Sequence, residues 1–552
     1  MAFVKNKPIS AFLRQFLRRK LSAGVVDGVG RVEDELGDGE DGVAVVDEVG
    51  EDSGQRLRRV EGGVVEQHDA ARLYLGGHPL ADGVRVVLIR RKEISPQEVL
   101  DAAIEAIEQV NPSLNAIVAR TYDAARAQLA KGVDMNAPFC GVPFVIKDEG
   151  GLMKDIPCTL GTRLSGRGIV TDHDTILGAR FKKAGVVVVA TAACPEFCWN
   201  NATETIRNGV TRNPWNPKLT SGGSSGGTAA IVAAGAVPMG HGSDGGGSIR
   251  MPAAACGLVG LKPTRFRIPT GPDGGDPGQA ADFIMSRSVR DTAAMLDAVE
   301  GPDPGCYGTA ERPTIPYSQV IQKDPPRLRI AYMLRTPYGD VYENHECVEA
   351  VKSAVGLLES LGHICVEDYP PLDVHYHEAR ILVQSVGTNA WIERVAKGSG
   401  LPISEDTLEP LVYKAYLEAR NVTASAYVAA KSELTKVMRD LGQFMEHYDI
   451  LISPTMGIMP LEAGFYNPFS RPEMPVHDWV LERRRWSGNT AMCNVTGQPS
   501  ITVPLEWSKE GLPIGIEIDG RVGEDALVLQ LSAQLERAKP WAGCHPEIYA
   551  GR

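Results

Sequence analysis

The chain has 552 residues, of which 43% are hydrophobic and 23% charged, and its formal net charge is −12. This composition is ample for a large core and contains no collagen-like, coiled-coil or repeat pattern. The acidic balance argues against nucleic acid as the main partner. The ten cysteines include no C-x-x-C pair, which predicts a reducing cytoplasm, and no apolar run reaches the ~20 residues of a membrane helix.

The first 82 residues do not share the pattern of the rest. Basic and apolar residues are interspersed up to residue 20, and residues 25–66 are rich in Gly, Val, Asp and Glu without an aromatic residue. A transit peptide or basic amphipathic anchor is one interpretation, but a disordered tail or an over-extended gene start explains this composition better. We therefore expect residues 1–82 to be a non-conforming extension and residues 83–552 to form one folded domain.

The first clear helix is predicted to begin at residue 95. Residues 95–98 read Ser-Pro-Gln-Glu, which supplies an N-cap, a proline at the first helical position and a capping-box glutamate. Further on, the apolar runs 142–146 and 185–189 predict buried strands, whereas 176–183 and 229–237 predict helices. This alternation is typical of an α/β fold whose sheet is covered by helices on both sides.

Residues 221–264 combine an unusual density of glycine with three serines, Ser224, Ser225 and Ser248. Glycine loses much conformational freedom on folding, so such a cluster indicates tight turns or backbone N–H groups left open to a ligand. Groups of that kind stabilise a phosphate or the oxyanion of acyl transfer.

Two known motifs, one of dinucleotide-binding folds and one of hydrolases, match parts of this segment. Residues 240–245 match G-x-G-x-x-G, but no helix begins inside the motif, and no Walker loop occurs. Residues 222–226 match the G-x-S-x-G elbow of α/β-hydrolases, which would make Ser224 a nucleophile served by Asp519 and His545. That esterase interpretation leaves the second cluster, residues 245–248, without a purpose.

A longer pattern includes both clusters. The doublet at 224–225 is followed 24 residues later by Ser248, and residues 247–264 continue as Gly-Ser-Ile-Arg-Met-Pro-Ala-Ala-Ala-Cys-Gly-Leu-Val-Gly-Leu-Lys-Pro-Thr. Upstream, residues 141–148 read Gly-Val-Pro-Phe-Val-Ile-Lys-Asp, and residues 448–455 and 494–500 supply further landmarks. Over about residues 88–545 the chain resembles the amidase signature family, whose fold is α/β, with one large, mixed, twisted sheet flanked by helices.

The resemblance implies roles for individual residues. Ser248 would be the nucleophile, Ser224 a bridging serine after a cis peptide bond from Gly223, and Lys147 the base. The backbone N–H groups around Gly245, Gly246 and Gly247 would form the oxyanion hole. In supporting roles, Asp244 and Arg250 would brace the loop as a charge pair, and Ser225 would donate a hydrogen bond.

The base can also be argued from its surroundings. A lysine takes a proton from serine only when burial lowers its pKa enough to leave it neutral, and Lys147 follows the buried run 142–146. His241, inside the glycine cluster, is the alternative base. Cys194 and Cys198 lie one helical turn apart, but without a second pair they are better interpreted as buried apolar residues than as metal ligands.

These observations predict an amidase that cleaves a small, largely uncharged amide through a serine acyl-enzyme, without metal or cofactor, and with ester and carbamate side activities. Residues 211–217, 241–242 and 262–265 most resemble the 6-aminohexanoate cyclic dimer hydrolase branch of the family. The alternatives are the glutamine-hydrolysing subunit of a tRNA-dependent amidotransferase and a non-enzymatic scaffold. The expected partner is the amide substrate alone, with no nucleic acid or membrane, and the oligomeric state stays open, a homodimer included.

Overall fold

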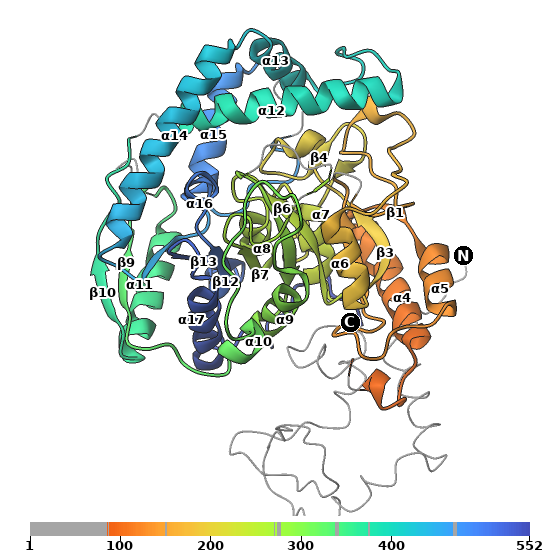
Figure 1. The fold of residues 1–552 in the computed structure, drawn as a ribbon, viewed down its shortest axis with the longest axis horizontal. Coiled ribbons are helices and arrows are strands. Elements are labelled where there is room, and N and C mark those ends of the chain that lie inside the picture. Colours follow the sequence, from red (N-terminus) through yellow and green to blue (C-terminus); the bar gives the residue numbers. More distant parts are fainter. Residues whose placement is uncertain are drawn as a thin grey trace, which may run out of the picture.

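An eleven-stranded sheet runs through the molecule in the computed structural model, with helices packed around it (Figure 1). The structure describes residues 86, 88–149, 152–269, 271–272, 278–336, 342–373, 376–466 and 472–551. The prediction for residues 1–82 therefore lies outside the described residues. Among the described helices, none is both long and apolar enough to cross a membrane.

The strands of the large sheet have the order β1-β3-β2-β6-β8-β7-β12-β13-β11-β9-β10. Their bounds are β1 (Ile117–Arg120), β2 (Pro143–Lys147), β3 (Val187–Ala192), β6 (Met239–Asp244), β7 (Val259–Lys262), β8 (Ala281–Ser286), β9 (Arg329–Tyr332), β10 (Ile364–Glu367), β11 (Ile450–Pro454), β12 (Ser500–Trp507) and β13 (Pro513–Gly520). A separate two-stranded sheet pairs β4 (Glu204–Thr205) with β5 (Gly209–Val210). Parallel and antiparallel pairs both occur in the large sheet, so the predicted mixed α/β fold is confirmed.

The helices pack around this sheet and above one end of it in Figure 1, where α12 and α13 lie at the top and α14 descends on the left. Their bounds are α4 (Pro96–Leu114), α5 (Tyr122–Ala130), α6 (Ile176–Ala184), α7 (Gly226–Ala233), α8 (Arg250–Cys256), α9 (Val289–Val299), α10 (Tyr317–Val320), α11 (His345–Ser360), α12 (Tyr376–Ser399), α13 (Pro410–Ala419), α14 (Ala424–Met445), α15 (Val476–Ser487), α16 (Thr490–Thr496) and α17 (Asp525–Ala538), with 3-10 turns at η1 (Arg163–Ser165) and η2 (Glu196–Cys198).

Local sequence signals account for the elements nearest the glycine-rich segment. Helix α4 begins with the predicted capping box, in which Ser95 accepts from the Glu98 backbone and the Glu98 side chain accepts from the Ser95 backbone. Strand β2 is buried along its whole length, as its apolar run predicts. Helix α7 is also fully buried, and its alanines and glycines allow the close packing of α7 against α8 and β6.

The centre of the sheet brings two distant segments together. Strand β2 pairs in parallel with both β3 and β6, with Val145 opposite Gly240. A Cβ atom added at Gly240 would lie 2.5 Å from a methyl group of Val145, so a glycine is needed for this close approach. Because the strands are parallel, the carboxyl ends of β2 and β6, at Lys147 and Asp244, lie at the same edge of the sheet.

Candidate active site

The glycine-rich segment forms two turns at this edge. One turn carries Ser224 and Ser225 immediately before α7, and the peptide bond between Gly223 and Ser224 is cis, as the family resemblance implied. The other turn joins β6 to α8 and carries Ser248. The Ser225 backbone N–H donates to the Ser248 carbonyl at 3.2 Å, so the two turns contact each other. Ser224 is completely buried, whereas Ser248 is partly exposed and accessible to a substrate.

Lys147 is the last residue of β2, and its side chain is buried. Its Nζ atom donates to Ser224 Oγ at 2.8 Å and to Ser243 Oγ at 2.6 Å. A third acceptor is Glu149 Oε2, 2.9 Å from Nζ. The lysine and bridging serine singled out in the sequence are therefore in direct contact, and the same lysine also forms an ion pair with a carboxylate that the sequence reasoning missed.

The Glu149 carboxylate changes the expected electrostatics of the lysine. Burial by itself lowers the pKa of Lys147, but negative charge on Cys198, Glu149 and Cys194 raises it, and the net shift is upward. Thiols are largely un-ionised at neutral pH, so Glu149 supplies the negative charge there. The expectation that burial gives Lys147 a lowered pKa is wrong, because a carboxylate within an ion-pair distance favours the ammonium form.

Asp148 lies between Lys147 and Glu149 in the sequence but has different contacts. It is buried, and its carboxylate accepts from the Thr159 backbone N–H at 2.5 Å and from the Thr159 hydroxyl. Burial raises the pKa of Asp148 to about 6, although these hydrogen bonds oppose the shift. Asp148 thus fixes the loop at Thr159 rather than contacting the serines.

The turn after β6 is held by the Asp244 carboxylate. Asp244 accepts from the backbone N–H groups of Gly247 at 2.6 Å and of Ile249 at 3.2 Å. The N–H of Gly247 is therefore already engaged, which corrects its expected place in an oxyanion hole. The N–H groups of Gly245, Gly246 and Ser248 donate to no other residue in the described part of the chain.

Asp244 and Arg250 form a completely buried ion pair. The Arg250 Nε and Nη2 atoms each lie 2.9 Å from an Asp244 oxygen, and Arg250 also donates to Asn494 at 2.8 Å. Burial favours the neutral acid, but Arg250 holds the pKa of Asp244 well below its usual range. The pair ties the turn to α16, where the Asn494 amide in turn donates to the Asp244 carbonyl at 2.7 Å.

Ser225 connects the same turn to β6. Its hydroxyl donates to the Ser243 carbonyl and accepts from the Ser243 backbone N–H, both at 3.3 Å. Ser243 was not singled out from the sequence, although its hydroxyl contacts both Lys147 and Glu149. The sequence feature that could have identified Ser243 is its position two residues from His241, which places both side chains on the same face of β6.

The competing assignments do not form catalytic relays. His241 Nε2 lies 3.4 Å from Asp282, and its ring meets Phe181 edge-on. The His545 ring packs on that of Tyr549, with the centroids 4.4 Å apart and the planes tilted by 36°, whereas the Ser224 hydroxyl contacts Lys147. The α/β-hydrolase interpretation is therefore wrong: its proposed histidine and serine have different partners.

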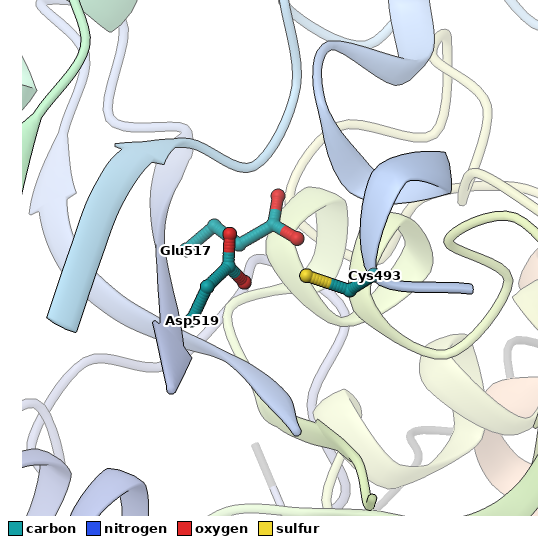
Figure 2. A group of neighbouring side chains, drawn as sticks. All are labelled: Cys493, Glu517 and Asp519. Atoms are coloured by element: carbon teal, nitrogen blue, oxygen red, sulfur yellow. The ribbon is translucent and has the colours of Figure 1, made fainter. Parts of the chain in front are cut away.

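The proposed acid of that elbow belongs to another cluster (Figure 2). Cys493, Glu517 and Asp519 are buried, and one ligand atom from each lies within 4.8 Å of the others. Arg250 Nη1 donates to Glu517 at 2.5 Å. Burial and the neighbouring Asp519 charge raise the pKa of Glu517, which favours the neutral form of this carboxyl group. We interpret the cluster as part of the Arg250 network.

Cys194 and Cys198 differ in their burial. The Cys194 thiol is buried and donates to the Asp148 carbonyl at 3.3 Å, whereas Cys198 is half-buried at the end of η2. This placement agrees with the prediction of a buried residue for Cys194 but not for Cys198.

Comparison with known proteins identifies the family. A family model described as Amidase matches residues 98–529. The chain belongs to the amidase signature family. A 6-aminohexanoate-cyclic-dimer hydrolase of Pseudomonas sp. (strain NK87) is 36% identical over 476 residues, which cover 84% of this chain and 95% of the relative.

Solved structures of the amidase signature family agree with this assignment. A 6-aminohexanoate cyclic dimer hydrolase complexed with substrate matches with a TM-score of 0.78 and 33% identity, covering 86% of this chain and 99% of that structure. A bacterial aryl acylamidase of the family matches with a TM-score of 0.75 and 26% identity, covering 85% and 97% of the two chains. The protein is thus an amidohydrolase that acts on amide C–N bonds, as predicted.

Proposed function

We propose that the amidase hydrolyses its substrate through an acyl-enzyme on Ser248, with Ser224 as the bridging serine and Lys147 as the base. The observation that carries this assignment is the 2.8 Å hydrogen bond from buried Lys147 to buried Ser224, beside a turn on which Ser248 is partly exposed. A serine hydroxyl becomes a strong nucleophile only when a neighbour takes its proton.

The reaction follows from this chain of groups. When Lys147 is a neutral amine, it accepts the proton of Ser224, which accepts the proton of Ser248 as the Ser248 oxygen attacks the amide carbonyl. The N–H groups of Gly245, Gly246 and Ser248 stabilise the resulting oxyanion. The proton then passes back to the leaving amine, the C–N bond breaks, and water hydrolyses the ester on Ser248 by the same route.

The substrate class follows from the relatives. Proteins named as 6-aminohexanoate-cyclic-dimer hydrolases share about a third of their residues with this chain over nearly their full length. We therefore infer that the substrate is a small or medium amide, cyclic or linear, without a requirement for charge. Esters and carbamates would react as side substrates because they form the same acyl-enzyme.

The assignment is tested with variants and a substrate panel. Ser248→Ala is expected to abolish turnover, and Ser224→Ala and Lys147→Ala to slow it by orders of magnitude, because members of one proton-relay unit fail together. The panel contains the cyclic and linear dimers of 6-aminohexanoate, an anilide, an ester, a carbamate and glutamine. Full turnover by Ser248→Ala would refute the mechanism, and a preference for glutamine would favour the amidotransferase subunit.

A further inference from the structure

The carboxylate of Glu149 contacts Lys147 in the site, but the proposed reaction does not use it. Its Oε2 atom lies 2.9 Å from Lys147 Nζ and also accepts from the Ser243 hydroxyl. Ser243 in turn accepts from Lys147 at 2.6 Å, so the three side chains form a closed triangle. The Glu149 side chain is 18% exposed, whereas that of Lys147 is 0% exposed.

The other titratable groups around this triangle do not replace Glu149. The Cys194 thiol stays neutral because its hydrogen bond to Cys198 and its burial raise its pKa well above the usual value. Cys198 is the partner of Cys194 in that hydrogen bond. His241, on β6, carries no negative charge, and the neighbouring Asp148 is turned toward Thr159. Glu149 is therefore the anion that Lys147 meets in this pocket.

The contacts of Lys147 match those of an ammonium group. An ammonium has three N–H donors and no acceptor, and Lys147 Nζ has three acceptors in Ser224, Ser243 and Glu149. In the ammonium form, Lys147 donates to Ser224, and its nitrogen has no lone pair with which to accept the proton of Ser224. The pKa of Glu149 is lowered by the charge of Lys147 in spite of burial, as expected for an ion pair.

We propose that Glu149 is a positioning residue that holds Lys147 as an ammonium in the resting enzyme and thereby sets the pH at which the base becomes available. This inference rests on the proposed role of Lys147 as the base. To become active, the Lys147–Glu149 pair loses one proton to water at the exposed edge of Glu149. The amine that remains accepts a proton from Ser224 during attack and returns it to the leaving group, so each turnover leaves the pair unchanged.

The test measures how fast the nucleophile reacts as a function of pH. The second-order rate of labelling by a fluorophosphonate, which reacts with activated serines, is recorded between pH 5 and 10 for the full-length protein and for Glu149→Gln. Loss of an opposite charge at this distance shifts a pKa by about 1 to 3 units. The rise in rate of the unmodified protein is expected near the upper end of the pH range or beyond it. In Glu149→Gln the midpoint is expected to fall by about 1 to 3 pH units, so that this variant is labelled faster at a given pH below the midpoint. An unchanged or higher midpoint would overturn the proposal.

Two further variants separate charge from packing. Glu149→Ala also removes the charge and is expected to move the midpoint in the same direction, which keeps the test decisive if the glutamine variant fails to fold. Glu149→Asp keeps the charge, and its midpoint is expected to lie closer to that of the unmodified protein than those of either neutral variant. An aspartate midpoint as low as the glutamine one would contradict a charge effect.

The labelled residue distinguishes the two proposals. Peptide mapping of each labelled variant is expected to find the phosphonyl group on Ser248. A label on another residue would refute the catalytic assignment itself, whereas a label on Ser248 with an unmoved midpoint would refute only the role of Glu149.

Discussion

Gly245 and Gly247 lie in the same turn but differ in their surroundings. A Cβ atom at Gly245 would meet nothing within 4 Å. At Gly247, φ is +119°, and a Cβ atom would lie 2.3 Å from Thr490 Oγ1, which donates to the Gly246 carbonyl at 2.7 Å. An L-residue is therefore strained at Gly247 and would displace the neighbour that fixes the Gly246 peptide.

This difference predicts unequal effects of the same substitution. Gly247→Ala is expected to lower Tm and to reduce kcat/KM by at least about 100-fold, the usual effect of losing an oxyanion donor, because the strained turn would displace the neighbouring N–H groups of Gly246 and Ser248. Gly245→Ala keeps its N–H group and serves as the matched control, with a clearly smaller loss. Equal losses of kcat/KM in the two variants would contradict the proposed geometry of the turn.

At the level of single residues, the motif spacing led to Lys147, Ser224 and Ser248, but not to Glu149 or Ser243. The fate of Glu149 depends on the direction in which the chain leaves β2 and on the hydroxyl that β6 presents from almost a hundred residues away. Neither is a property of the local sequence. The predicted direction of the Lys147 pKa shift was wrong for the same reason.

Among the elements, β13 is unusual because it carries two carboxylates into the core. Glu517 and Asp519 are two residues apart, so they lie on one face of the strand, and both are buried. Burial raises the pKa of both carboxyl groups, and the charge of Asp519 raises that of Glu517 further. The folded state therefore binds protons more tightly than the unfolded state, and the contribution of the pair to stability falls as pH rises through the folded pKa values.

Asp519→Asn removes one of the two like charges. Its Tm relative to the unmodified protein is expected to rise as pH increases from 5 to 8. This range lies between the ordinary carboxyl pKa of roughly 4 and the pKa of about 8 for Glu517. The measurement is thermal unfolding at several pH values. Asp123→Asn, on the exposed face of α5, is the control for removing one negative charge from the surface. A constant difference for Asp519→Asn would contradict the raised pKa values of this pair.

Element positions were predictable where a local signal marks an end. The capping box located the start of α4, and the apolar run located β2. The helix expected at 229–237 instead spans Gly226–Ala233, because the chain leaves the helix at Ala234 and Gly235 has φ +73°. Apolarity alone does not locate such an end, since the residues on both sides of it are buried.

For the whole molecule, the family motif predicted the mixed sheet, but the periodicity of the sequence could not give the strand order. The site depends on β2 lying beside β6, two strands nearly a hundred residues apart. That adjacency depends on long-range packing, such as the contact of Gly240 with Val145.

The boundary of the fold can be tested by truncation. The described core includes Val86 and Ile89, which are 7% and 1% exposed. Deletion of residues 1–82 is expected to leave Tm and activity nearly unchanged, because residues 25–66 contain no aromatic residue and no periodic apolar pattern that would pack against the fold. Deletion of residues 1–94 removes both core residues and is expected to lower Tm. A large loss of stability in the shorter deletion would show that the extension contributes to the fold.

The central claim, that Ser248 is the nucleophile activated through Ser224 and Lys147, is tested most directly by trapping the acyl-enzyme. The protein is mixed with an activated ester, quenched in acid within the first turnover and digested for mass spectrometry. We predict an acyl group on the peptide that contains Ser248, and no acyl group in Ser248→Ala. Acylation of Ser224, with Ser248→Ala still acylated, would contradict the account.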